Sequence, residues 1–331
     1  MTSKIDHEVP RVVFSRCLGF ENCRYNGGVI SEPMVEQIKP FVEAITVCPE
    51  VEIGLGIPRQ PIRLIGDEES PRLVQPESGL DVTERMKAFS ARFLAEVEAP
   101  DGFVLKYGSP SCGPREVKLY VNEKRGASST KTSGMFGGAI AEKYPFCVVE
   151  DEGRLKSFDI RQHFLTRLFA LARFRRASDC GTMRDLVAFH SRHKLLLMAY
   201  NQTKMRELGR IVANPDKRAV PEVFSSYANS LHLALEKAPR RTSAINVLMH
   251  GLGYVSDQLQ SSEKAFFLES LEQYRHRHVP LSVPTSIMRS WIVRFDVTYL
   301  GDQIYFEPFP LDLVDVLDSG KGRMPTARDV G

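Results

Sequence analysis

The first half of the chain alternates short apolar runs with stretches of helical spacing. Four runs have the length and composition of strands, and they span residues 11–15, 41–48, 103–106 and 144–150. Asp81-Val82-Thr83-Glu84 is typical of a helix start, and apolar residues recur at helical spacing from Met86 to Leu94. Strands that alternate with helices predict βαβ units, and therefore an α/β domain with a mostly parallel, Rossmann-like sheet.

The second half has a different pattern, in which helical spacing dominates residues 158–300 and prolines interrupt it. Between His163 and Arg176 the apolar side chains share one helical face and arginines occupy the others. We therefore predict an α/β domain over residues 1–155 and an all-α domain over residues 156–318. Residues 319–331 are polar and rich in charge, and we expect them to form a disordered tail.

Composition narrows the class of protein. The chain has 331 residues, 43% of them hydrophobic and 26% charged, which is ordinary for a globular protein. Its apolar runs fall short of a membrane helix, and its first residues carry charges where a signal peptide needs an apolar stretch. We therefore expect a cytoplasmic protein. Its 6 cysteines are too few for a disulfide scaffold, so a special cysteine would be a metal ligand or a nucleophile.

Charge is unevenly distributed along the chain. Residues 161–331 hold 24 Lys and Arg against 17 Asp and Glu, whereas the first 160 residues hold 20 against 24. The excess of basic over acidic residues is concentrated in residues 161–218, with 13 basic and 4 acidic residues. Such asymmetry can mark a nucleic-acid partner, although a solvated basic helix face would have the same composition.

Three cysteines occupy loops that follow predicted strands. Cys17 and Cys48 lie directly after the first and second runs, and Cys112 lies in the loop after the third. Ligands of open α/β sheets bind at the carboxyl ends of the strands, so three thiols converging there would make a metal site. The long gaps between the cysteines differ from those of a zinc knuckle, and buried structural thiols are the simpler alternative.

The residues around these cysteines carry a family resemblance. The first block is Ser15-Arg16-Cys17-Leu18-Gly19 with Arg24-Tyr25-Asn26-Gly27, and the second is Cys48-Pro49-Glu50 followed by Pro58-Arg59. The third block is Ser109-Pro110-Ser111-Cys112-Gly113. In this order the blocks resemble the thiouracil desulfidase family over the first 150–160 residues.

The helical half resembles the YbgA-like domain often fused to that family, with the local signature Phe189-His190-Ser191-Arg192-His193-Lys194. The fusion as a whole is similar to tRNA 4-thiouridine desulfidases. The resemblance implies a [4Fe-4S] cluster held by Cys17, Cys48 and Cys112, with one iron left open. A zinc site on the same thiols is the alternative metal.

The implied reaction is hydrolysis without electron transfer. An open iron can act as a Lewis acid, and a thiocarbonyl sulfur is a soft ligand that suits it. Water would attack the thiolated carbon, which requires a base. Glu50 is our first candidate for this base, and Glu52 is the next. Ser109 is our first candidate for a hydroxyl that positions the water or relays a proton, and Ser111 is the next. Some family members have Asp in place of Asn26, which leaves the role of this position open.

Further candidates concern substrate binding. We expect the thiolated base to be contacted by Arg24, Tyr25, Asn26, Arg59 and Ser111. The target base must leave its stack to reach a cluster in a crevice, and basic residues would hold the tRNA backbone. The predicted tRNA contacts are Arg161, Arg167, Arg173, Arg175, Arg176, Arg192 and Lys194.

Three cysteines remain outside the predicted ligand set. Cys23 is a possible spare ligand or sulfide acceptor, but we expect it to pack in its loop, and we expect Cys147 and Cys180 to be core or surface residues. Two other functions stay open. One is an enzyme acting on free thiouracil or a thionucleoside, and the other is a non-catalytic iron–sulfur or zinc sensor that binds nucleic acid.

Overall fold

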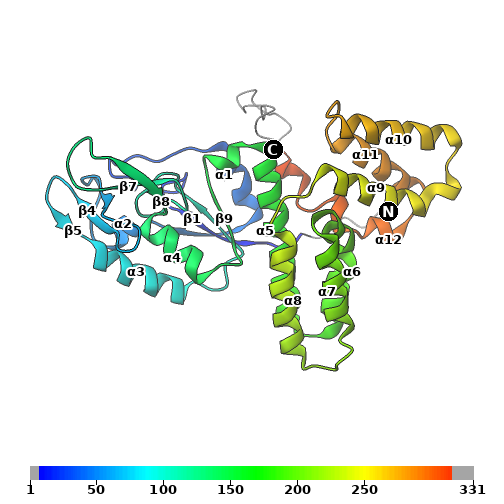
Figure 1. Ribbon diagram of the computed structural model, residues 1–331, viewed down its shortest axis with the longest axis horizontal. Helices are drawn as coiled ribbons and strands as arrows, with labels where there is room; N and C mark the ends of the chain where they lie inside the picture. The colour runs from blue at the N-terminus through cyan, green and yellow to red at the C-terminus, as the bar shows by residue number, and fades with distance from the viewer. Residues whose placement is uncertain (1–6, 315–331) are drawn as a thin grey trace. The chain divides into compact units, whose positions relative to one another are not determined.

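The computed structural model describes residues 7–314, which form two compact units (Figure 1). One unit holds residues 9–172 with 312–314, and the other holds residues 173–311 with 7–8. The boundary falls inside the long helix α5 (Phe158–Cys180). The predicted tail, residues 319–331, lies outside the described residues. Within residues 7–314 every helix is too short or too polar to cross a bilayer.

A four-stranded parallel sheet forms the frame of the first unit. Its order is β2-β1-β6-β9, with strands β1 (Arg11–Ser15), β2 (Glu43–Val47), β6 (Gly102–Leu105) and β9 (Val148–Asp151). In its register Val13 lies opposite Ile45 on one side and Phe103 on the other. β1 and β6 are central and buried, which is why their sequences are nearly continuous apolar runs. The predicted parallel sheet is confirmed.

Two of the predicted strands begin later than expected. Residues 39–41 form a 3₁₀ turn, η1 (Lys39–Phe41), that follows helix α1 (Pro33–Ile38), so β2 starts only at Glu43. Tyr144 ends helix α4 (Met135–Lys143) and donates its hydroxyl hydrogen to the carbonyl of Leu94, so β9 starts at Val148. In both segments the apolar residue expected at the start of the strand belongs to a helical turn or a helix end instead.

A second sheet was not predicted. Its order is β5-β4-β3-β7-β8, and all its pairs are antiparallel except β3 with β7. The strands have 2 to 4 residues and one of them is wholly polar, so they lack the apolar runs that identified the first sheet. They are β3 (Arg63–Ile65), β4 (Arg72–Gln75), β5 (Leu80–Asp81), β7 (Val117–Tyr120) and β8 (Ser129–Thr132).

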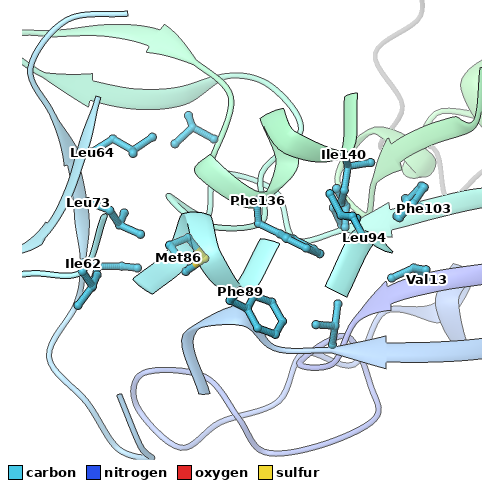
Figure 2. Packing of buried hydrophobic residues seen from close by; sticks show 14 of the residues in the cluster. Val13, Ile62, Leu64, Leu73, Met86, Phe89, Leu94, Phe103, Phe136 and Ile140 are labelled. Carbon is cyan, nitrogen blue, oxygen red and sulfur yellow. The ribbon is translucent and has the colours of Figure 1, made fainter. Parts of the chain in front are cut away.

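One apolar core joins the two sheets through α4 and α3 (Thr83–Glu96), which starts where the sequence predicts (Figure 2). Val13 and Phe103 enter the core from the first sheet, and Leu64 enters it from the second. Phe136 of α4 is 0% exposed, and its ring centroid lies 6.0 Å from that of Phe89 and 5.6 Å from that of Phe93. The helices therefore hold both sheets in one packed body.

The second unit is all helical within its described residues, as predicted. Helices α6, α7 and α8 pack side by side, and α9 to α12 complete the unit (Figure 1). Thr182 caps α6 and Asn201 caps α7, since each side-chain oxygen accepts a backbone N–H of the first turn. The bounds are α6 (Met183–Tyr200), α7 (Gln202–Ala213), α8 (Val220–Leu235), α9 (Arg241–Val255), α10 (Ser261–Arg275), α11 (Ser282–Arg294) and α12 (Thr298–Gly301).

Replacing Phe136→Ala should test the shared core. Loss of a fully buried aromatic side chain should lower the free energy of unfolding by about 3–5 kcal/mol, because a cavity opens between the two helices. Phe146→Ala is the matched control, since Phe146 belongs to the same unit and is 46% exposed, and it should change stability by less than about 1 kcal/mol. Urea unfolding of the full chain measures both. Equal effects of the two substitutions would contradict this description of the core.

Candidate functional site

The ends of three neighbouring strands bring the three predicted cysteines into one pocket. β1 is followed by Cys17, β2 by Cys48, and the loop after β6 carries Cys112. Because β2, β1 and β6 are parallel neighbours, these loops leave the sheet at the same edge. The thiols line a pocket of about 270 Å³, and Arg16, Arg24, Arg59 and Lys106 are also in its wall with a single acidic residue, Glu50.

Cys23 is a fourth thiol in this pocket. Its loop folds back, since the Ile30 N–H donates to the Cys17 carbonyl at 2.8 Å, and Cys23 is 1% exposed. Cys23 lines the pocket with Cys17 and Cys48, and the Cys48 thiol donates to the Cys23 carbonyl at 3.7 Å. It packs in its loop as expected, and it also lies beside two predicted ligands, where a spare ligand or a sulfide acceptor would have to be. The spacing of six residues from Cys17 was the only sequence signal.

Close packing opposes deprotonation of these thiols. The contact with Cys17 is the main cause that raises the pKa of Cys23 to about 11. The contact with Cys23, followed by burial, raises the pKa of Cys48 far above its ordinary value. Burial raises the pKa of Cys112 to about 12. A cationic metal centre would reverse this balance, because it stabilises thiolates.

The remaining two cysteines lie elsewhere. Cys147 is half-buried and donates to the carbonyl of Pro100 at 3.0 Å, while Cys180 is exposed at the end of α5. Neither lines the pocket. Within residues 7–314, no three His, Cys, Asp or Glu side chains surround one point as the ligands of a single metal ion would.

A half-buried hydrogen-bond chain joins Ser109 at the pocket wall to Glu50. The Arg59 Nε donates to Glu50 Oε2 at 2.8 Å, and the Ser111 hydroxyl donates to Glu50 Oε1 at 2.7 Å. Ser109 Oγ lies 2.9 Å from Ser111 Oγ, and since Ser111 gives its only hydrogen to the carboxylate, Ser109 is the donor of that bond. Ser109 lines the pocket and Ser111 is fully buried behind it. The three side chains can therefore pass a proton from the pocket to Glu50.

Other candidates near the pocket are placed differently. Glu52 pairs with Arg16 at 2.8 Å and is absent from the pocket wall, whereas Glu50 lines the pocket. Asn26 is exposed, and its Oδ1 accepts the Gly28 N–H at 3.1 Å to close its own turn. Of the predicted substrate contacts, Arg24, Tyr25 and Arg59 line the pocket.

Gly134, the N-cap of α4, and Gly137, in the first turn of α4, fix the loop that carries Cys112. A Cβ atom on Gly137 would lie 2.5 Å from the carbonyl oxygen of Gly113 and 2.8 Å from that of Cys112. A Cβ atom on Gly134 would lie 2.6 Å from the carbonyl oxygen of Ser111. Only glycine allows this close approach. The Phe136 and Gly137 N–H groups donate to the Ser111 carbonyl at 2.9 and 3.1 Å. The start of α4 therefore holds the third cysteine loop in place.

A buried carboxylate that the sequence did not identify supports the same loop. Glu152 accepts hydrogen bonds from Lys106 Nζ and from the Tyr107 N–H, each at 2.6 Å. It follows β9, which pairs with β6, so the contact joins residues about 45 positions apart. Such a long-range contact leaves no local pattern in the sequence.

The predicted tRNA contacts divide into buried and exposed residues. Arg161 is buried and donates to the carbonyl of Leu155, and Arg173 is buried and donates to that of Pro308. These two guanidinium groups therefore bind the chain itself. Arg167 and Arg175 are half-buried, whereas Arg176, Arg192 and Lys194 are exposed; Arg176 pairs with Glu8 at 3.2 Å.

The fold and the pocket define the class of protein: an α/β protein with a thiol-rich pocket at the carboxyl edge of a parallel sheet, followed by a helical unit. Comparison with known families agrees with this division. Residues 12–152 match the family model described as 2-thiouracil desulfurase, and residues 194–310 match DUF1722, described as a protein of unknown function.

Individual relatives match each half. The uncharacterized protein YbbK of Bacillus subtilis (strain 168) is 34% identical over 110 residues, which are 31% of this chain and 72% of that protein. The uncharacterized protein YbgA of Escherichia coli (strain K12) is 29% identical over 148 residues, which are 44% of this chain and 88% of that protein.

Among solved structures, the [4Fe-4S]-dependent thiouracil desulfidase TudS is 30% identical. The match covers 44% of this chain and 93% of that one, with a TM-score of 0.35. The chain belongs to the 2-thiouracil desulfurase family through its N-terminal unit, and it joins to this a DUF1722, YbgA-like unit.

The substitution Gly137→Ala should displace the loop that carries Cys112 and so disturb the pocket. The new methyl group would push the loop of Cys112 away, so we expect a loss of about 1–3 kcal/mol in stability and faster alkylation of Cys112 in the cluster-free protein. Gly253→Ala in α9 is the matched control, because nothing lies within 4 Å of its Cβ position and the change should be neutral or stabilising. Urea unfolding and peptide mass spectrometry after iodoacetamide treatment measure the two effects. An unchanged alkylation rate in Gly137→Ala would show that the glycine does not position the loop.

Proposed function

We propose that this chain hydrolyses 4-thiouridine in tRNA to uridine and sulfide, with a [4Fe-4S] cluster held by Cys17, Cys48 and Cys112. The observation that carries the proposal is the convergence of these three thiols in one pocket with a single carboxylate, Glu50. Membership of the 2-thiouracil desulfurase family supports removal of sulfur from a thiolated pyrimidine.

The donor set fits such a cluster. Cluster ligands bind different iron atoms, so three thiols spread over the wall of a pocket suit a cluster. Four cations line the same wall, and they would balance the negative charge of cysteine thiolates. A cluster bound through three cysteines would supply an open iron, a Lewis acid for the soft thiocarbonyl sulfur.

The residues of the chain would then handle the water and its proton. Glu50 accepts the proton of the attacking water, directly or through Ser109 and Ser111, because these hydroxyls already form a chain to its carboxylate. Arg59 holds the other carboxylate oxygen and so fixes the orientation of Glu50. The proton held on Glu50 can return to the ring nitrogen or to the leaving sulfur.

The helical unit supplies charge for a polynucleotide. Residues 173–311 contain 19 Lys and Arg against 13 Asp and Glu. Arg184, Arg192 and Lys194 of α6 and Arg206 of α7 are exposed and have no carboxylate within ion-pair distance among residues 7–314. Cations without protein partners are available to phosphates, and their contacts would make affinity for tRNA salt-dependent.

The decisive experiment follows turnover by protein reconstituted with iron and sulfide without oxygen. Loss of 4-thiouridine from tRNA and release of sulfide should be stoichiometric. Cys48→Ala should lose iron and turnover but keep its affinity for tRNA, while Cys180→Ala should behave like the parent, because Cys180 lies outside the pocket. Glu50→Gln should lower kcat by about 10²–10⁴-fold with the iron content intact.

Each alternative has a distinct outcome. Turnover of free 4-thiouridine or thiouracil without turnover of tRNA would replace the tRNA assignment by a small-molecule one. Binding of tRNA without sulfide release by a loaded protein would indicate a sensor. If Glu52→Gln lost as much activity as Glu50→Gln, the assignment of the base to Glu50 would be wrong.

A second prediction concerns the binding of tRNA by the helical unit. The double substitution Arg192→Ala with Lys194→Ala should raise KM for thiolated tRNA by about tenfold or more and lower the salt slope of binding by about 1–2. Turnover of free 4-thiouridine should not change, because the nucleoside has no phosphate. Lys118→Ala with Lys143→Ala removes the same charge from exposed positions of the first unit and should leave KM unchanged. Equal effects of the two double substitutions on KM would indicate a dependence on total charge and no specific tRNA contact of Arg192 and Lys194.

A further inference from the structure

Two large aromatic side chains stand exposed at the wall of the catalytic pocket. Tyr25 is 43% exposed and lies in the loop after β1, and Tyr107 is 48% exposed and lies in the loop after β6. Both line the pocket. β1 and β6 are neighbours, so the two loops leave the sheet side by side. Exposed aromatic surface beside a pocket is typical of a surface that a ligand covers.

Tyr107 is fixed although its ring is exposed. Its N–H donates to Glu152 at 2.6 Å, and its carbonyl accepts from Lys106 Nζ at 2.8 Å. Lys106 in turn pairs with the same buried Glu152 at 2.6 Å. The base of the ring lies over Gly153, where a Cβ atom would be 3.6 Å from Tyr107 Cγ. This half-buried ion pair thus preorganises Tyr107, and the proton chain to Glu50 does not use Tyr107.

Tyr25 is tied to the catalytic network from the other loop. Its carbonyl accepts the Arg59 N–H at 2.8 Å, and Arg59 binds Glu50. The Arg24 guanidinium lies 5.6 Å from the centre of the Tyr25 ring, which holds a cation beside the aromatic surface. Both tyrosines are therefore anchored through their backbones while their rings remain free to contact a ligand.

We propose that Tyr107, with Tyr25 as a second wall, forms a stacking slot that holds the pyrimidine ring of the substrate over the thiols. The inference rests on the proposed function, because that function supplies the ligand, a thiolated uracil taken out of its stack. Stacking on an aromatic side chain contributes about 1–3 kcal/mol per base and tolerates changes on the ring edge. The slot therefore holds the ring, while the pocket floor selects the sulfur.

Tyr107 variants of the cluster-loaded full chain test the slot with free 4-thiouridine, which isolates stacking from phosphate contacts. Tyr107→Ala should raise KM by about 5- to 150-fold, the change that the loss of one stacked base predicts. Tyr107→Phe should stay within about twofold of the parent, because the ring remains. Iron content and kcat should change little in either variant. Phe146→Ala, at an equally exposed position outside the pocket, should leave KM unchanged.

A binding signal independent of turnover comes from Tyr107→Trp. The parent has 1 tryptophan, Trp291, which is 6% exposed and belongs to the other unit. A base stacked on the new indole should quench its emission, so 4-thiouridine should cause saturable quenching in this variant. Phe146→Trp, treated in the same way, should show none.

The outcomes separate the slot from the proposed function. An unchanged KM in Tyr107→Ala, or a fall in its iron content together with kcat, would overturn the slot, since the second result would indicate a structural role. Full turnover by the parent without quenching in Tyr107→Trp would also overturn it. If the parent fails to desulfurise any thiolated substrate but 4-thiouridine still quenches Tyr107→Trp, the proposed function fails and the slot is supported.

Discussion

Parallel pairing of β2, β1 and β6 is the constraint on which the rest of the site depends. Parallel neighbours send the chain out of the sheet at one edge, and each of these strands is followed by a loop that carries a cysteine. Thiols from positions 17, 48 and 112 thus meet without any short-range motif. The observed register, in which Val13 lies opposite Ile45 and Phe103, sets how far each loop extends past this edge.

Other contacts then fix the loops at this edge. Gly134 and Gly137 let the start of α4 approach the loop of Cys112, and Glu152, directly after β9, holds the beginning of the same loop. Arg59 binds Glu50 and also donates to the carbonyl of Cys23 at 3.0 Å, so one guanidinium connects the carboxylate to the loop of the fourth thiol. The pocket is therefore held by backbone and charge contacts from several parts of the first unit.

Those parts of the molecule that have a local sequence pattern could be predicted from the sequence. Continuous apolar runs identified β1 and β6, and the position of each cysteine after a run indicated the pocket. The second sheet escaped detection because its strands are short and β8 is polar and exposed. The partners of Glu50, the support of Tyr107 and the position of Cys23 depend on contacts between distant segments. Burial of Arg161 and Arg173 followed from packing of α5 and could not be seen from their charge.

Helix α5 has a consequence for how this protein can be divided. The family match of the first unit ends at residue 152, but the compact unit continues to Ala172. Leu168 of α5 is fully buried, and a Cβ atom on Gly102 of β6 would lie 2.8 Å from its Cδ1. The first two-thirds of α5 thus cover the central sheet, and the rest of the helix belongs to the other unit. A fragment cut before α5 would lose this cover and leave apolar sheet surface open to water, so the natural fusion point lies within a helix and not in a linker.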